Sequence, residues 1–201
     1  MTRYPLPQTF LSIETESEKE RFITNWRQKF PSFENYFNSK GLTGIITSAF
    51  ECLIKVSHMR DDESQIFSLI SIFEGLFFSE NFNHRNKKRA ISHNFSKFCT
   101  KYQKNWPFQG DTLTSQDLKE FIEIAYELRN NLAHPEQVRA LERKPLVMFK
   151  YSNGPLKEDA LSHLKRLITE YFPLFIRFAL ETFFALGFGD ADQWYQFLKT
   201  V

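Results

Sequence analysis

Three residues in the second half of the chain have the types and the spacing that phosphate chemistry requires. Arg129, Asn130 and His134 form the pattern Arg-Asn-x-x-x-His, and Pro135 follows the histidine. A guanidinium holds a phosphate through two parallel hydrogen bonds and stabilises negative charge that develops on it. An imidazole exchanges a proton near neutral pH, which is the requirement for a general acid or base. The pattern therefore suits a site that binds phosphate and transfers a proton.

These residues are predicted to lie at the end of a helix. We expect it to start at Thr114 or Ser115, because Thr114 and Asp117 have capping-box spacing. It should end near Ala133, because a proline disfavours helical geometry in the residue before it. At about 100° per residue, Arg129 falls inside the apolar stripe of this helix. An unpaired cation in a core is too costly to persist, so Arg129 must either extend to solvent or lie beside an anion.

The relation between Arg129 and His134 leaves alternatives open. In a regular helix the two side chains would point about 140° apart and would not share a site. They would come together if the helix ends at His134 and the ring turns, or if a second subunit shares the groove. Asn130 lies one turn before His134 and could orient its ring. Under a purely structural interpretation, Arg129 forms an internal ion pair and His134 is a cation near a helix C-terminus.

Two further residues are candidates for the same site. Glu74 flanks the apolar stripe of a helix expected over residues 63–79, and its carboxylate would be the anion that Arg129 requires. Tyr126 lies one turn before Asn130 and could stack on a base or bond a phosphate. Each has a structural alternative, because most glutamates are exposed and tyrosines are commonly half-buried.

A basic segment separates these two helices in the sequence. Residues 81–104 contain seven Lys or Arg and no Asp or Glu, although the net charge of the chain is only +2. On a helix expected over residues 85–104, apolar side chains would occupy one face and a basic stripe the opposite face. Such a stripe suits a phosphate backbone, and a merely solvated face is the alternative. The residues predicted to contact such a backbone are Arg85, Lys88, Arg89, His93, Lys97, Lys101 and Lys104, together with Tyr126.

Composition and periodicity predict an all-α fold. The 201 residues include 23 Phe, only 7 Gly and 8 Pro, and few β-branched side chains, which favours helices packed on helices. At most one short β-segment is expected, at residues 146–151. The expected organisation is an N-terminal helical extension over residues 1–60 and a helical domain over residues 61–201. The expected helices cover residues 16–30, 43–59, 63–79, 85–104, 114–133, 158–186 (bent or broken at Pro173) and 190–199.

Composition also excludes several classes of protein. The 2 Cys rule out a disulfide framework and a cysteine-based zinc site, and no Cys, His and carboxylate cluster has metal-ligand spacing. We therefore expect no metal and no cofactor. The N-terminus lacks the apolar run of a signal peptide, and the most apolar stretch, residues 172–188, contains Arg177 and Glu181. The expectation is a cytoplasmic protein that does not enter a membrane.

The motif and its surroundings resemble the HEPN superfamily, named for a nucleotide-binding domain of higher eukaryotes and prokaryotes. Residues 124–134 have the sequence Ile-Ala-Tyr-x-x-Arg-Asn-Asn-Leu-Ala-His. A basic helix and the Ile-Phe-Glu-Gly-Leu helix at residues 72–76 precede them, and this order is similar to the Apea-like branch of the superfamily. The resemblance covers roughly residues 63–186. The family often carries a small residue after the histidine, where this chain has Pro135.

The resemblance implies a helical domain that acts as a metal-independent RNA endonuclease. Many members are homodimers in which two Arg/His motifs face each other, and many act as toxins or in anti-phage defence, often beside a nucleotidyltransferase antitoxin. Others have lost activity and bind RNA, a nucleotide or an antitoxin. By this resemblance, Arg129 would stabilise the phosphate and His134 would be the general acid/base. Asn130 would orient the site, and Glu74 would be the partner of Arg129.

The chemistry of such a reaction agrees with these residue types. RNA cleavage without a metal uses the neighbouring 2′-hydroxyl as nucleophile and leaves a 2′,3′-cyclic phosphate and a 5′-hydroxyl. One histidine cannot easily act as base and acid at once, so two copies of His134 around one phosphate would supply both roles. We therefore expect a homodimeric RNA endonuclease. A non-catalytic HEPN module that binds RNA, a nucleotide or an antitoxin is the first alternative, and a structural helical protein is the second.

Overall fold

The computed structural model of the protein describes residues 15–40, 44–55, 62–78, 86–108, 111–134 and 159–201. These residues form eight α-helices and one antiparallel two-stranded ribbon of β1 (Pro107–Phe108) and β2 (Asp111–Thr112). The predicted all-α class is confirmed. The helices are α1 (Glu16–Lys29), α2 (Ser32–Lys40), α3 (Ile45–Lys55), α4 (Asp62–Phe77), α5 (Lys87–Lys101), α6 (Ser115–Ala133), α7 (Asp159–Ala185) and α8 (Ala191–Thr200).

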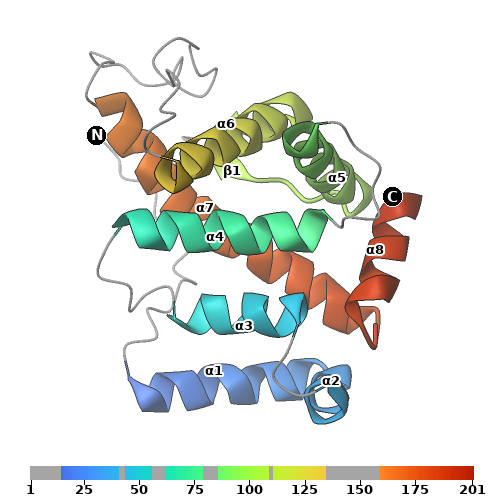
Figure 1. The fold of residues 1–201 in the computed structure, drawn as a ribbon. Helices are drawn as coiled ribbons and strands as arrows, with labels where there is room; N and C mark the ends of the chain where they lie inside the picture. The colour runs from blue at the N-terminus through green and yellow to red at the C-terminus, as the bar shows by residue number, and fades with distance from the viewer. Residues whose placement is uncertain (1–14, 41–43, 56–61, 79–85, 109–110, 135–158) are drawn as a thin grey trace.

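The helices are stacked in layers (Figure 1). α1 and α2 form one end of the molecule, α3 and then α4 lie above them, and α5 and α6 form the opposite end. α7, which is 27 residues long, crosses behind the stack and contacts α2, α3 and α4. α8 lies beside the C-terminal end of α5. The last helix of the chain therefore meets the end of the basic helix, although the two are far apart in sequence.

Aromatic side chains fill the centre of the fold. Phe73 of α4, Phe95 of α5 and Phe172 and Phe175 of α7 are almost completely buried. Ring centroids are 5.0 Å apart for Phe73 and Phe95, 4.9 Å for Phe73 and Phe172, and 4.7 Å for Phe95 and Phe175. Separations of about 4.5–7 Å are typical of favourable aromatic pairs. The many Phe residues of the sequence thus hold α4, α5 and α7 together.

The same core reaches the first two helices. Trp26 of α1 and Phe33 of α2 contact Phe184 of α7, with ring centroids 5.9 and 5.2 Å away. Ser32, at the start of α2, donates a hydrogen bond to the Phe184 carbonyl at 2.7 Å. The segment predicted as an N-terminal extension therefore contributes buried side chains to the core that contains the rest of the described residues.

The differences from the predicted elements are local. α2 was not expected; it is separated from α1 because Pro31 disfavours helical geometry in Phe30, which is extended. The short β1–β2 ribbon was also missed, and the segment predicted as a strand, residues 146–151, lies outside the described residues. α7 continues through Pro173. None of the described helices combines the length and the apolarity that a membrane crossing demands.

Candidate functional site

α6 carries the Arg-Asn-x-x-x-His motif and is held firmly in place. Its N-terminus forms the predicted capping box, in which Thr114 Oγ1 accepts from the Asp117 N–H and the Asp117 carboxylate accepts from the Thr114 N–H at 2.9 Å. Its apolar face packs against α4 and α5. The helix ends at Ala133, and His134 is the C-cap, with its N–H donating to the Asn130 carbonyl at 2.9 Å. The predicted end of the helix before Pro135 is therefore confirmed.

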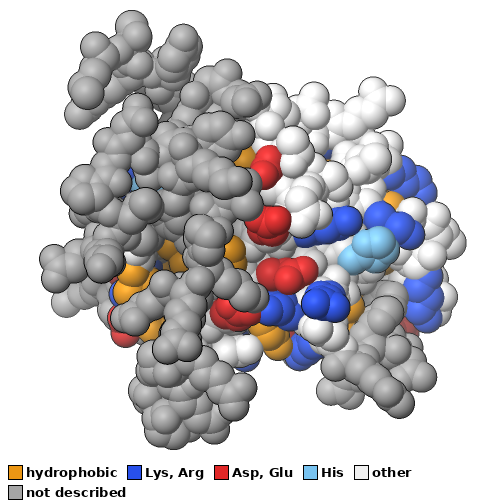
Figure 2. Space-filling model, turned by 90° about the horizontal axis from the view of Figure 1, so that it is seen from above, with side chains coloured by type: hydrophobic (Ala, Val, Ile, Leu, Met, Phe, Trp, Pro, Cys, Tyr) orange, Lys and Arg blue, Asp and Glu red, His pale blue; other side chains and the backbone are white. Residues whose placement is uncertain are grey.

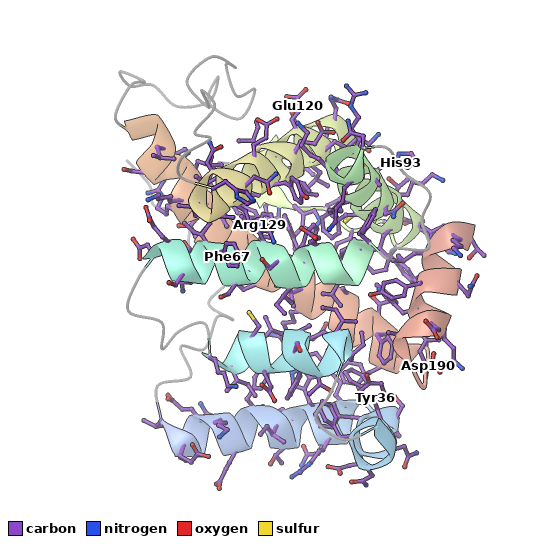
Figure 3. The ribbon with its side chains drawn as sticks, viewed as in Figure 1. Tyr36, Phe67, His93, Glu120, Arg129 and Asp190 are labelled. Atoms are coloured by element: carbon purple, nitrogen blue, oxygen red, sulfur yellow. The ribbon has the colours of Figure 1, made fainter. Side chains whose placement is uncertain are left out.

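Arg129 lies between α6 and α4 and is half-buried (Figure 3). Its Nη1 donates to Asn130 Oδ1 at 3.2 Å, and its Nε donates to Ser71 Oγ on α4 at 3.4 Å. Its Cζ lies 4.9 Å from the ring centroid of Phe67, also on α4. Both acceptors are neutral and the ring is uncharged. Among the described residues, Arg129 is thus fixed by groups that leave its positive charge available to an anion.

Glu74, the predicted partner of Arg129, forms its ion pair with Lys87 at the start of α5. The Glu74 side chain is only 13 % exposed, and its Oε2 is buried without a hydrogen-bond partner among the described residues. Ser71 lies one turn earlier on the same face of α4. In the structure Ser71 therefore takes the place next to Arg129 that the sequence argument assigned to Glu74, and the carboxylate connects α4 to α5.

The other motif residues have distinct surroundings. His134 is exposed at the end of α6, so solvent or a ligand can reach its ring. The Asn130 side chain contacts the Arg129 guanidinium, whereas the sequence suggested that it orients His134. Tyr126 is half-buried and packs against the core. The structure brings Arg129 and Asn130 together directly and places His134 one helical turn beyond Asn130.

The predicted basic face of α5 is exposed. Figure 2 shows Lys and Arg side chains gathered around a histidine on the face seen from above. Lys88 is an exception, because it is half-buried and pairs with Glu127 of α6. Arg85 lies outside the described residues, and α5 ends at Lys101, so Lys104 follows the helix rather than continuing its stripe. The exposed members of the predicted set are Arg89, His93, Lys97, Lys101 and Lys104.

Acidic side chains of α6 limit the basic face on one side. Glu127 pairs with Lys88, and Glu123 accepts a hydrogen bond from Ser92 of α5 at 3.0 Å. Figure 2 shows Asp and Glu side chains next to the Lys and Arg side chains on this face. The signal for this acidic edge was present in the spacing of Glu120, Glu123 and Glu127, which places them along one side of a helix. The potential that a polyanion would meet is therefore positive along α5 and weaker next to α6.

Two residues that contact Arg129 were missed by the sequence argument, Phe67 and Ser71. They are spaced four residues apart on α4, and Glu74 follows three residues later, so all three share a face. Phe67 is 37 % exposed, which is unusual among the large apolar side chains that the structure describes. The spacing of Phe67 and Ser71 indicated only that they share a helix face. The packing of α6 on α4 is what places both of them against Arg129.

The residues that the structure describes form no metal site, and their thiols are not reactive. No group of three His, Cys, Asp or Glu side chains there could hold a metal ion. Burial raises the pKa of the Cys99 thiol to about 12 and that of Cys52 to about 11, so both are neutral thiols at pH 7.

Comparisons of the chain with protein-family models, with curated proteins and with solved structures yield no match.

Proposed function

We propose that the protein is a metal-independent RNA endonuclease of the HEPN type. The observation that carries this proposal is the state of Arg129: a half-buried guanidinium fixed by an amide, a hydroxyl and an aromatic ring, without a carboxylate among its described partners. Neutral contacts orient the cation and leave its charge for a phosphate. The exposed His134 at the end of the same helix supplies the group for proton transfer.

The reaction follows from these roles. The 2′-hydroxyl oxygen attacks the adjacent phosphorus, and its proton passes to the imidazole of His134. Arg129 stabilises the negative charge that grows on the phosphate oxygens. The bond from phosphorus to the 5′-oxygen breaks, and the leaving oxygen takes a proton from a second imidazole. The products are a 2′,3′-cyclic phosphate and a 5′-hydroxyl, and His134 of a second copy of the chain is the proposed proton donor.

The exposed face of α5 is the proposed path of the RNA backbone. Arg89, His93, Lys97 and Lys101 repeat every four residues, with a rise of about 6 Å per step. The start of α5 is linked to the motif region, because Lys87 pairs with Glu74 and Lys88 pairs with Glu127. A strand bound along α5 would therefore lead toward Arg129.

The biological setting that we propose is a toxin or an anti-phage effector in the cytoplasm. A nuclease of this kind would be harmful to its own cell, which is why we propose a nucleotidyltransferase-type antitoxin as a regulatory partner. The toxin or anti-phage role and the antitoxin partner are proposed from the resemblance of the motif to the superfamily. Both depend on the nuclease activity, which the cleavage experiment tests.

The test is cleavage of total RNA by purified protein in EDTA, with His134→Ala and Arg129→Ala beside the wild type. Arg21→Ala, at an exposed position on α1, is the matched control for loss of an arginine. We expect cleavage by the wild type and the control only, with 2′,3′-cyclic phosphate ends. RNA binding without cleavage by any form would replace the proposal with a non-catalytic HEPN module. Cleavage that survives both motif substitutions would refute the assigned site.

A further inference from the structure

A cluster of partly exposed aromatic rings lies at the end of the basic helix, away from the motif. It is formed where α5, α7 and α8 meet, and lysines border it. These rings pack against the core and are half-buried rather than enclosed. We call this cluster the aromatic–lysine patch; it consists of Tyr102, Phe178, Phe188, Phe197, Lys101 and Lys104.

The rings of the patch are close enough to form one surface. The Tyr102 centroid lies 6.2 Å from that of Phe178 and 6.3 Å from that of Phe197. Phe188 lies 5.5 Å from Phe197. The end of α5, α7 and the segment from residue 188 into α8 thus place four half-buried rings close together. Fully apolar cores enclose such rings, so their partial exposure here calls for an explanation.

The lysines lie on the faces of these rings. Lys101 Nζ is 4.8 Å from the centroid of Phe197, and Lys104 Nζ is 5.5 Å from that of Phe178 and 4.9 Å from that of the buried Trp106. Lys104 reaches this position because Gln103 has a left-handed φ of 50° and the Lys104 N–H closes the end of α5 on the Cys99 carbonyl at 2.9 Å. Phe178 and Phe197 therefore each have a lysine beside them, while buried core rings pack against them as well: Phe98 lies 4.8 Å from Phe178, and Trp194 lies 5.5 Å from Phe197.

We propose that the aromatic–lysine patch binds single-stranded RNA by stacking its bases on these rings. This inference deepens the proposed function, because it rests on RNA as the ligand and names a second contact region. Stacked aromatic rings with neighbouring cations are the combination that binds single strands without sequence preference. A base that stacks on a ring displaces the ammonium group, which is free to move onto the adjacent phosphate.

The energetic order favours this exchange. A cation–π contact at an exposed site is weaker than the stacking of a base on an aromatic ring. The displaced lysine keeps a favourable contact, because it gains a phosphate oxygen in place of the ring. A duplex would gain less, because its bases are already paired and stacked. The patch therefore selects single strands over duplexes.

The position of the patch fits a strand that also reaches the motif. α5 is 15 residues long, and its start is joined to the motif region through Lys87 and Glu74. From Lys87 to Lys101 the helix rises about 21 Å. The exposed stripe of Arg89, His93 and Lys97 lies between the two ends. A single strand that stacks on the patch can follow this stripe and place a phosphate near Arg129.

The test measures binding with an RNA that cannot be cleaved. A fluorescein-labelled, single-stranded 2′-O-methyl oligonucleotide lacks the attacking hydroxyl, so anisotropy reports affinity alone. We expect Tyr102→Leu and Phe197→Leu each to weaken binding about 5- to 100-fold. We expect the double variant Lys101→Gln/Lys104→Gln to reduce the slope of log affinity against log salt by about 1.4. The matched control is Lys19→Gln/Lys55→Gln, which removes two lysines from α1 and α3 whose side chains are 40 % and 66 % exposed.

Photo-cross-linking of the wild-type protein tests the same contacts if Tyr102→Leu or Phe197→Leu unfolds. Wild-type protein is irradiated with a single strand that contains 5-iodouridine, and the cross-linked peptides are identified by mass spectrometry. Cross-links at Tyr102 or Phe197 support the patch. Cross-links confined to other regions, or duplex binding as tight as that of the single strand, overturn it. If the patch binds single-stranded RNA but RNA is not cleaved, the proposed nuclease activity is refuted and RNA binding by the patch is not. If RNA is cleaved but the patch variants bind RNA as tightly as the wild type, RNA binding by the patch is refuted and the nuclease activity is not.

Discussion

Replacing Asn130 with alanine should slow the proposed RNA cleavage about tenfold, and this single change tests how Arg129 is held. The Asn130 amide oxygen accepts from Arg129 Nη1 at 3.2 Å, next to the charge that would meet the phosphate. Ser71 accepts from Nε at the longer distance of 3.4 Å, and the Phe67 centroid lies 4.9 Å from Cζ. The structure therefore ranks three restraints on one guanidinium by their geometry.

The magnitudes follow from the type of each contact. A hydrogen bond to a charged group contributes about 1.5–3 kcal/mol, and the half-buried site argues for the lower end, about 1.5 kcal/mol for Asn130. The Phe67 ring is 37 % exposed, so its cation–π contact contributes about 0.5–1 kcal/mol. The long contact to Ser71 should contribute about 0.5 kcal/mol. At about 1.4 kcal/mol per factor of ten, the expected losses are about tenfold, about two- to fivefold and about twofold.

The assay is the initial rate of cleavage of a fluorescent single-stranded RNA in EDTA. Asn130→Ala, Phe67→Ala and Ser71→Ala are compared with Asn131→Ala, which removes the amide at the next position of α6. Urea unfolding of each variant separates loss of activity from loss of stability. Arg129→Ala should lower the rate about 100-fold or more, because it removes the cation itself. The reasoning is refuted if Ser71→Ala is as harmful as Asn130→Ala, or if Asn131→Ala is the most harmful of the three amide and hydroxyl changes.

Three further predictions concern the fold that positions the site. Trp194→Phe should lower the free energy of unfolding, measured in urea, by about 2 kcal/mol. The buried indole N–H of Trp194 donates to the Leu76 carbonyl at 2.7 Å, and a buried carbonyl left without a partner is costly. A loss below about 0.5 kcal/mol would contradict this prediction. Thr114→Ala should cost about 1 kcal/mol through loss of the α6 capping box, and an unchanged midpoint would count against that box. Burial raises the pKa of Cys99 from 9.0 and that of Tyr171 from 10.0, in each case to about 12, which favours their neutral forms in the folded state. The stability that the neutral forms of Cys99 and Tyr171 contribute is therefore fully present below pH 9 and declines as the pH rises toward 12. Urea midpoints that stay constant between pH 9 and pH 12 would refute the burial of these two groups.

The local features of the site follow from local residues, and the sequence was sufficient to predict them. The capping box at Thr114 and the proline after His134 determine where α6 begins and ends, because caps and prolines act within one or two turns. The division of α5 into an apolar face and a basic face follows from the 3.6-residue period. Helical periodicity also indicated that Arg129 lies on the packed side of α6, where the structure places it.

The partners of these residues were decided only by tertiary structure. Ser71 and Arg129 are 58 residues apart, and Glu74 is within one turn of Ser71. A helical projection gives the angle of each side chain about the axis of its helix. It does not give the position of one helix along the axis of its neighbour. That position decides whether Arg129 meets Ser71 or Glu74, and it is set by the aromatic core, in which Phe172 of α7 packs against both Phe121 of α6 and Phe73 of α4. For the same reason the sequence could not reveal the aromatic–lysine patch, whose rings come from parts of the chain that meet only when it is folded.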